Sequence, residues 1–116
     1  MKQNLIYDKS FEFSLSIIEL YKVLIQNKEY IISKQLLKSG TSIGANVSES
    51  SAAQSRKDFI SKLSISSKEA RETKYWLLLL QKSKLVDIDY TRYINEVEEI
   101  IKILTSIIKT SQERDK

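Results

Sequence analysis

The stretch SGTSIGANVSES, residues 39–50, decides how the rest of the chain folds. It contains both glycines of the sequence among Ser, Thr and Asn, a composition typical of a loop. Small and apolar residues nevertheless keep steps of three and four through it, namely Leu36, Gly40, Ile43 and Val47. Because these steps match one face of a helix, the stretch is predicted to be the middle of a helix.

Gly40 and Gly44 are four residues apart and therefore share one face of this helix. Two interior glycines destabilise a helix by about 1 kcal/mol each relative to Ala, so we expect them where a side chain would clash. Small residues at such positions let two helix backbones approach closely. Ser66, Ser67 and Ala70 offer a matching small surface further along the chain. We therefore predict an antiparallel hairpin of the second and third helices, tight at this level.

Helical periodicity extends over most of the chain. The four predicted helices cover residues 9–27, 31–53, 56–82 and 90–111. Asp8, Ser55 and Asp89 are their predicted N-caps. With no Pro and no run of strand-like alternation, the sequence predicts an all-α, antiparallel up-down-up-down four-helix bundle, formed by residues 1–116 as one domain.

The chain contains neither His nor Cys. His is the commonest general base near neutral pH and the commonest metal ligand, and Cys supplies thiolate nucleophiles and zinc ligands. We therefore expect no metal, no cofactor and no enzymatic activity. Composition leaves a Ser–Lys dyad open, because both residue types are abundant, but no spacing singles one out.

A phosphate-binding loop is the alternative interpretation of the two glycines. That motif places its glycines five residues apart, follows the second with Lys and lies between a strand and a helix. Here the glycines are four apart, Ala45 follows Gly44, and no strand is predicted before them. The spacing therefore disfavours a phosphate loop.

Positive charge is concentrated in the middle of the chain. Residues 56–84 carry eight Lys and Arg against three acidic residues, whereas residues 85–116 carry five against seven. Cationic side chains contact phosphates, and Tyr75 and Trp76 could stack on unpaired bases. The candidate nucleic-acid-binding residues are Lys34, Lys38, Arg56, Lys57, Lys62, Lys68, Arg71 and Lys74. The alternative is a solvated helix face, with both aromatic residues in the core or a subunit interface.

Polar residues also lie along single stripes of the second and third helices. They are Ser42, Asn46 and Glu49 on one helix and Glu69 and Glu72 on the other. Turned inward, such groups must be hydrogen-bonded, since a bare buried polar group costs a few kcal/mol. We interpret them as a polar layer or a wet surface that fixes helix register. A small-molecule pocket around Asn46 and Glu49 is the alternative.

The predicted first and last helices are apolar over more than half of their circumference, which suggests that some faces are buried between chains. Residues 1–13 lack the long apolar region of a signal peptide. The longest apolar run, residues 76–80, is far shorter than a membrane span. We expect a cytoplasmic protein that does not enter the membrane.

The stretches QLLKSGTSIGANVSES (35–50) and SRKDFISKLSISSKEARETKYWLLLL (55–80) resemble a family of bacterial four-helix bundle proteins. Its members are often encoded in intervening sequences of large-subunit ribosomal RNA genes and are often labelled ribosomal proteins. The resemblance covers nearly the whole chain and is strongest over residues 35–80. The departures are Lys38, Gly40, Ser48 and Ser50, which stand where Arg, Ala, Ala and Gly are common.

The resemblance implies a four-helix bundle that assembles as a homopentamer and has no established enzymatic activity. The chain is also similar to the accessory protein of diversity-generating retroelements, a pentameric barrel that binds nucleic acid and a reverse transcriptase. The residues that match the family's motif have no transferable role: Ser42, Asn46, Glu49, Arg56, Lys57, Asp58, Glu69 and Glu72.

From the residues and the resemblance together, we expect a non-enzymatic homo-oligomer that binds RNA or DNA through a basic face of the second and third helices. The alternative is a protein-interaction scaffold that has no affinity of its own for nucleic acid. The two interpretations differ in whether the basic side chains converge on one surface.

Overall fold

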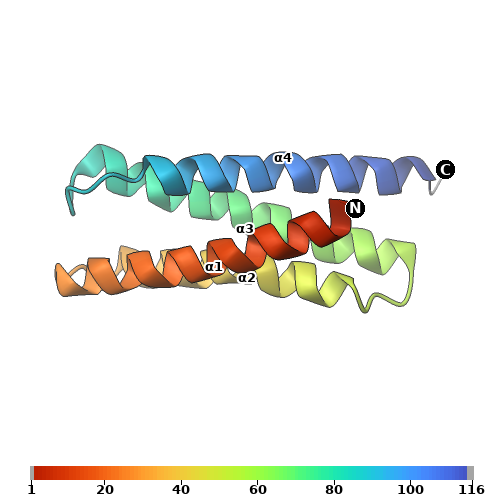
Figure 1. Cartoon of the computed structure of the whole chain (residues 1–116), viewed down its shortest axis with the longest axis horizontal. Helices are drawn as coiled ribbons and strands as arrows, with labels where there is room; N and C mark the ends of the chain where they lie inside the picture. The colour runs from red at the N-terminus through yellow and green to blue at the C-terminus, as the bar shows by residue number, and fades with distance from the viewer. Residues whose placement is uncertain (1, 115–116) are drawn as a thin grey trace.

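The computed structural model describes residues 2–114. Its four helices are α1 (Lys2–Gln26), α2 (Ile32–Ser50), α3 (Arg56–Ser83) and α4 (Thr91–Arg114). Each helix runs antiparallel to the previous one, and α4 returns beside α1, which confirms the up-down-up-down bundle (Figure 1). The bundle measures 48 × 21 × 21 Å. The contact between α1 and α4 is less extensive than the contacts between successive helices.

Helix α1 begins well before its predicted start, so Asp8 lies inside the helix and the prediction that it is an N-cap is wrong. The reason is Ile6, which continues the inward row of Phe13 one heptad earlier and is buried in the core. The other two predicted caps agree with the structure. Ser55 Oγ accepts the backbone N–H of Asp58 at 3.0 Å, and Asp89 Oδ1 accepts that of Thr91 at 2.9 Å.

The core is made of large apolar side chains from all four helices, but α2 contributes only three of them. They are Leu36, Ile43 and Val47. The rest of the buried face of α2 consists of Ser33, Ser39, Gly40 and Ser50. Because these residues are small, α2 can lie close to both of its neighbours.

The two glycines of α2 face α1, so the prediction that α3 packs against them is wrong. A Cβ atom at Gly40 would lie 2.9 Å from Ile17 Cγ2, and one at Gly44 would lie 3.2 Å from the backbone oxygen of Ser10. The glycine row is turned toward α1 because a different row of α2, through Ser39 and Ile43, meets α3.

The small residues of α3 make the second close contact of α2 through hydrogen bonds. Ser66 Oγ donates to the backbone oxygen of Ile43 at 2.8 Å, and Thr73 Oγ1 lies 2.9 Å from Ser39 Oγ. Ala70, between them on α3, is fully buried. Within residues 2–114, no buried side-chain nitrogen or oxygen lacks a hydrogen-bond partner. These buried hydroxyls therefore join two helices without the penalty of an unsatisfied polar group.

The N-terminus of α2 is capped by Glu29, a role that the sequence analysis did not assign. The backbone N–H groups of Ile32 and Ser33 donate to its two carboxylate oxygens at 2.8 and 2.6 Å, and that of Ile31 donates at 3.2 Å. Burial alone would raise the pKa of Glu29, but these backbone hydrogen bonds outweigh it and hold the pKa below the ordinary value of 4.5.

The loops α1–α2 and α3–α4 lie at the same end of the bundle (Figure 1). Lys28 and Lys84 end α1 and α3 in the left-handed region, with φ of 64° and 56°. Tyr90 is buried there, and its hydroxyl donates to the backbone oxygen of Val86 at 2.7 Å. Burial, followed by the negative charges of Glu29 and Asp87, raises the pKa of Tyr90 to about 12.

We expect the substitution Gly40→Ala to lower the free energy of unfolding by about 1 kcal/mol. The added methyl group meets the buried Ile17 side chain, and overpacking of about 1–3 kcal/mol exceeds the gain of about 1 kcal/mol in helix propensity. In an Ile17→Ala background the same substitution should become stabilising, because the crowding atoms are gone. Urea unfolding of the four variants in this cycle measures the coupling.

Ala45→Gly is the matched control, because Ala45 is exposed on the same helix. It should cost about 1 kcal/mol in both backgrounds from helix propensity alone. An equal effect of Gly40→Ala in the two backgrounds would contradict the close contact with Ile17.

We expect Glu29→Gln to lower the free energy of unfolding by about 1–2 kcal/mol at pH 7, as the loss of a good N-cap does. Because the pKa of Glu29 is depressed in the folded state, its stabilisation is present above the ordinary carboxyl value of 4.5 and is lost as the pH falls through the folded value. The difference in free energy of unfolding between wild type and variant should therefore become smaller below about pH 4.5. Glu19→Gln, at an exposed site on α1, is the control and should show no such gap. A gap of equal size at pH 3 and pH 7 would argue against the cap.

Candidate nucleic-acid interface

One exposed row of α3 combines cations, hydroxyls and an aromatic ring. We call it the α3 basic row, and it consists of Lys57, Ser61, Ser64, Lys68, Arg71, Tyr75 and Lys82, all exposed. Its members follow one another at steps of four, three or seven residues, so they lie along one side of the helix. The opposite side of α3 carries the buried residues Leu63, Ala70 and Leu77. Burial of that side holds the basic row outward.

The α3 basic row contains no acidic residue. Within the part of the chain that the structure describes, none of its four cations forms an ion pair. The row extends from Lys57 to Lys82, about 38 Å at 1.5 Å per residue. Lys82 was not among the predicted residues, although it lies seven residues after Tyr75 and the heptad spacing points to it.

The two predicted aromatic residues have different environments. Tyr75 is 58% exposed in the basic row, whereas Trp76 is partly buried against the core. Their rings meet edge to face with centroids 5.1 Å apart, and Trp76 Nε1 donates to Glu72 Oε2 at 3.2 Å. Trp76 therefore supports the bundle, and Tyr75 remains accessible to a ligand.

Two of the predicted cations lie on the flanks of α3, where they bridge to neighbouring helices. Lys62 Nζ lies 3.4 Å from a carboxylate oxygen of Glu49 on α2, and Lys74 Nζ lies 3.5 Å from one of Glu98 on α4. The two ion pairs lie on opposite sides of α3. They leave Lys62 and Lys74 less available to a ligand than the cations of the α3 basic row.

The remaining predicted cations are dispersed. Lys34 and Lys38 are exposed on the outer face of α2, and Arg56 is the first residue of α3 at one end of the bundle. Of the eight predicted residues, the structure thus places only Lys57, Lys68 and Arg71 together in the α3 basic row.

The predicted polar stripe of α2 lies along its edge and not in the interior. Ser42 Oγ donates to the backbone oxygen of Lys38 at 2.7 Å, and Asn46 Nδ2 donates to that of Ser42 at 2.9 Å. Both side chains are half-buried, and Glu49 is exposed. On α3, Glu69 is half-buried and Glu72 exposed. The buried polar contacts between α2 and α3 are made instead by hydroxyls of Ser39, Ser66 and Thr73.

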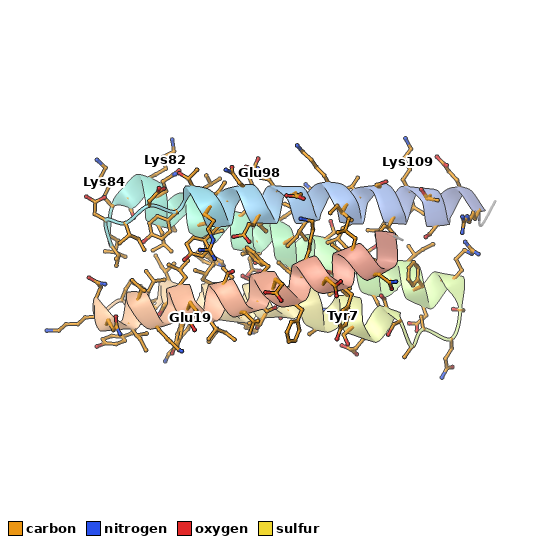
Figure 2. The ribbon with its side chains drawn as sticks, viewed as in Figure 1. Tyr7, Glu19, Lys82, Lys84, Glu98 and Lys109 are labelled. Carbon is orange, nitrogen blue, oxygen red and sulfur yellow. The ribbon has the colours of Figure 1, made fainter. Side chains whose placement is uncertain are left out.

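Helix α1 carries an exposed apolar row, which we call the α1 apolar stripe. It consists of Tyr7, Phe11, Leu15 and Ile18, which are 37–53% exposed. The rings of Tyr7 and Phe11 stack with centroids 6.5 Å apart. Figure 2 shows Tyr7 on the side of α1 turned away from α4. The stripe is therefore an apolar surface that the single chain does not cover.

A seam of polar contacts joins the outer edges of α1 and α4. Lys9 Nζ lies 2.6 Å from Glu99 Oε1, and Arg92 donates to Ser16 Oγ at 3.0 Å. Beside the Lys9 pair is an open cleft of about 270 Å³, which also borders Asp8, Glu12 and Glu96. Among residues 2–114, no group of acidic side chains is arranged to hold a metal ion.

No helix within residues 2–114 is long and apolar enough to cross a membrane. The structure also resembles the crystal structure of a protein of unknown function from the S23 ribosomal protein family of Bacteroides thetaiotaomicron. The two chains are 52% identical and superpose with a TM-score of 0.90, over 94% of this chain and 99% of the other. None of the curated proteins matches this chain.

The family model that matches the chain is described as the 23S rRNA-intervening sequence protein, and the match covers residues 2–106. Neither description indicates an enzyme. The family resemblance drawn from residues 35–80 is confirmed. The chain belongs to the 23S rRNA-intervening sequence protein family.

Proposed function

We propose that this chain forms a non-enzymatic homo-oligomer that binds RNA or DNA along the α3 basic row. The observation that carries the proposal is the row itself, in which four unpaired cations share one side of a helix with no acidic residue among them. A merely solvated helix face usually mixes both signs of charge. A surface of one sign attracts a polyanion over a long range.

The side chains of the row match the chemistry of a nucleic-acid backbone. Lys57, Lys68, Arg71 and Lys82 can neutralise phosphates, and serine hydroxyls can donate to phosphate oxygens. The length of about 38 Å corresponds to about one turn of a duplex. Tyr75 adds a ring that could stack on an unpaired base. These contacts read the backbone and not the sequence, so we expect weak base preference.

The α1 apolar stripe supports self-association. Exposed aromatic and aliphatic side chains in one row mark an interaction surface more often than a solvated one. A second copy of the chain is the proposed occupant, and five copies are what the family resemblance implies. In such an assembly each copy would add one basic row, and repeated weak contacts would raise the overall affinity.

The alternative is a scaffold that docks a protein partner on the α1 apolar stripe and has no affinity of its own for nucleic acid. The same exposed row, Tyr7 to Ile18, is the observation that favours it. The two proposals make opposite predictions for the purified protein with nucleic acid.

We expect the variant Lys68→Gln/Arg71→Gln to bind oligonucleotides at least tenfold more weakly than wild type, because two phosphate contacts are lost. If all four cations of the row contact a duplex, the slope of log K against log salt should be about −3.6 per protomer for wild type and about 2 units shallower for the variant. Fluorescence anisotropy with single-stranded RNA, structured RNA and duplex DNA across a salt series measures both.

Lys102→Gln/Lys109→Gln is the matched control, because both lysines are exposed on α4 and the change in net charge is the same. Its binding should remain close to that of wild type. Equal losses in the two variants would show that net charge and not the basic row drives binding. Absence of binding by wild type at low salt would favour the scaffold.

We expect Phe11→Glu to dissociate the oligomer, because the substitution places a charge in the centre of the α1 apolar stripe. Leu85→Glu is the control, since Leu85 is equally exposed but lies in the α3–α4 loop. Light scattering gives the mass, and circular dichroism should show that both variants remain helical. A wild-type monomer, or an oligomer that survives Phe11→Glu, would contradict this interface.

A further inference from the structure

A polar pocket of about 410 Å³ lies at the end of the bundle where α3 begins and α4 ends. The α2–α3 loop forms one wall, and the last turn of α4 forms another. The described residues that line it include two arginines, four serines and one aromatic ring, but no acidic residue: Ser50, Ser51, Ala53, Ser55, Arg56, Phe59, Ser111 and Arg114. Its chemistry therefore differs from that of the acidic cleft between α1 and α4.

One hydroxyl of the pocket has no partner. Ser111 is only 8% exposed, and its side chain makes no hydrogen bond to any described residue. Its oxygen is nevertheless not sealed from solvent, because no fully buried side-chain oxygen in residues 2–114 lacks a partner. Ser111 is one of the residues that line the pocket, so a ligand in the pocket can reach its side chain. A largely buried hydroxyl without a partner can donate a hydrogen bond to a ligand that enters the pocket.

The other serines divide into two groups. The hydroxyls of Ser50 and Ser51 donate to backbone oxygens in the last turn of α2, at 2.6 and 2.7 Å. Ser55 Oγ accepts a backbone N–H as the N-cap of α3, so its own proton has no acceptor among the described residues. Ser55 and Ser111 are thus the two hydroxyl donors that the pocket offers to a ligand.

The electrostatics of the pocket favour an anion. The N-terminus of α3 brings the positive end of a 28-residue helix, whereas the C-termini of α2 and α4 bring negative ends. The helix dipoles alone therefore do not decide the sign. The positive charge that favours an anion comes from the guanidinium group of Arg114, which is exposed at the pocket and can bind phosphate in a bidentate manner. Arg56 also lines the pocket, but it already has an interaction partner of its own.

We propose that this pocket binds the terminal phosphate of a nucleic-acid strand. A phosphate monoester carries nearly two negative charges and three acceptor oxygens, whereas a backbone phosphodiester carries one charge. The Arg114 guanidinium and the hydroxyls of Ser55 and Ser111 offer several donors to the three oxygens of a monoester. Phe59, half-buried in the wall, supplies an apolar surface for the terminal sugar or base. This inference rests on the proposed nucleic-acid binding and specifies which part of the strand is held at the bundle end.

The test compares oligonucleotides of one sequence that end in a 5′-phosphate, a 3′-phosphate or hydroxyls only, bound to the full-length protein. Wild type should bind at least one phosphorylated form about tenfold more tightly than the hydroxyl form. Arg114→Gln and Ser111→Ala should each reduce this preference, without weakening the hydroxyl form. Lys109→Gln, which removes one charge from the exposed face of α4, is the control and should keep the preference.

A second measurement separates this inference from the proposed function. A nucleoside 5′-monophosphate and inorganic phosphate are added to the protein alone, and the melting temperature is followed. A rise with wild type that is absent with Arg114→Gln supports the pocket even if no oligonucleotide binds. Oligonucleotide binding with no end preference, together with no response to either small phosphate, overturns the pocket and leaves the basic row standing.

Discussion

The close approach of α1 to α2 is the constraint on which the rest of the bundle depends. Because Gly40 and Gly44 have no side chain, the Ile17 side chain can pack directly on α2 at Gly40, and the backbone of α1 at Ser10 can lie close to Gly44. Any larger residue at these positions would push Ile17 or the backbone of Ser10 outward. The contact with α2 therefore fixes which face of α1 is buried, and so it fixes the rotation of α1 about its own axis. That orientation turns Phe11 away from the core, although the residue is as apolar as those that are buried.

Much of the fold could be predicted from the sequence because its signals are local and repeated. The helical period runs through SGTSIGANVSES despite the loop-like composition, and the Ser55 cap follows from a short-range pattern. The partner of the glycines could not be predicted in the same way. Two rows of small residues on α2 face two different helices, and only the packing angle decides which row meets which helix. The early start of α1 was missed for a related reason, since a single buried Ile6 extends a helix without any cap signal.

The candidate site was predictable in kind but not in detail. Composition placed positive charge on α3, but it could not show that Lys62 and Lys74 turn to opposite flanks and pair with Glu49 and Glu98. Their positions relative to the neighbouring helices depend on the bundle geometry. The cap made by Glu29 was missed because a glutamate three residues before a helix carries no strong signal. Glu29 directly follows Lys28, which has a left-handed backbone conformation, and its carboxylate accepts the first backbone N–H groups of α2.

The seam between α1 and α4 closes the ring of helices and is also its least extensive contact. Its outer edge is held by the Lys9–Glu99 ion pair and the Arg92–Ser16 hydrogen bond, which are partly exposed and therefore contribute little stability. Proteins open first where contacts are few and solvated. In this bundle α1 and α4 are each held more firmly by the helix next to them in sequence than by each other. The contact between α1 and α4 is therefore the weakest of the four helix interfaces. Slow amide exchange should be concentrated on α2 and α3, and α1 and α4 should separate from each other before the whole bundle unfolds.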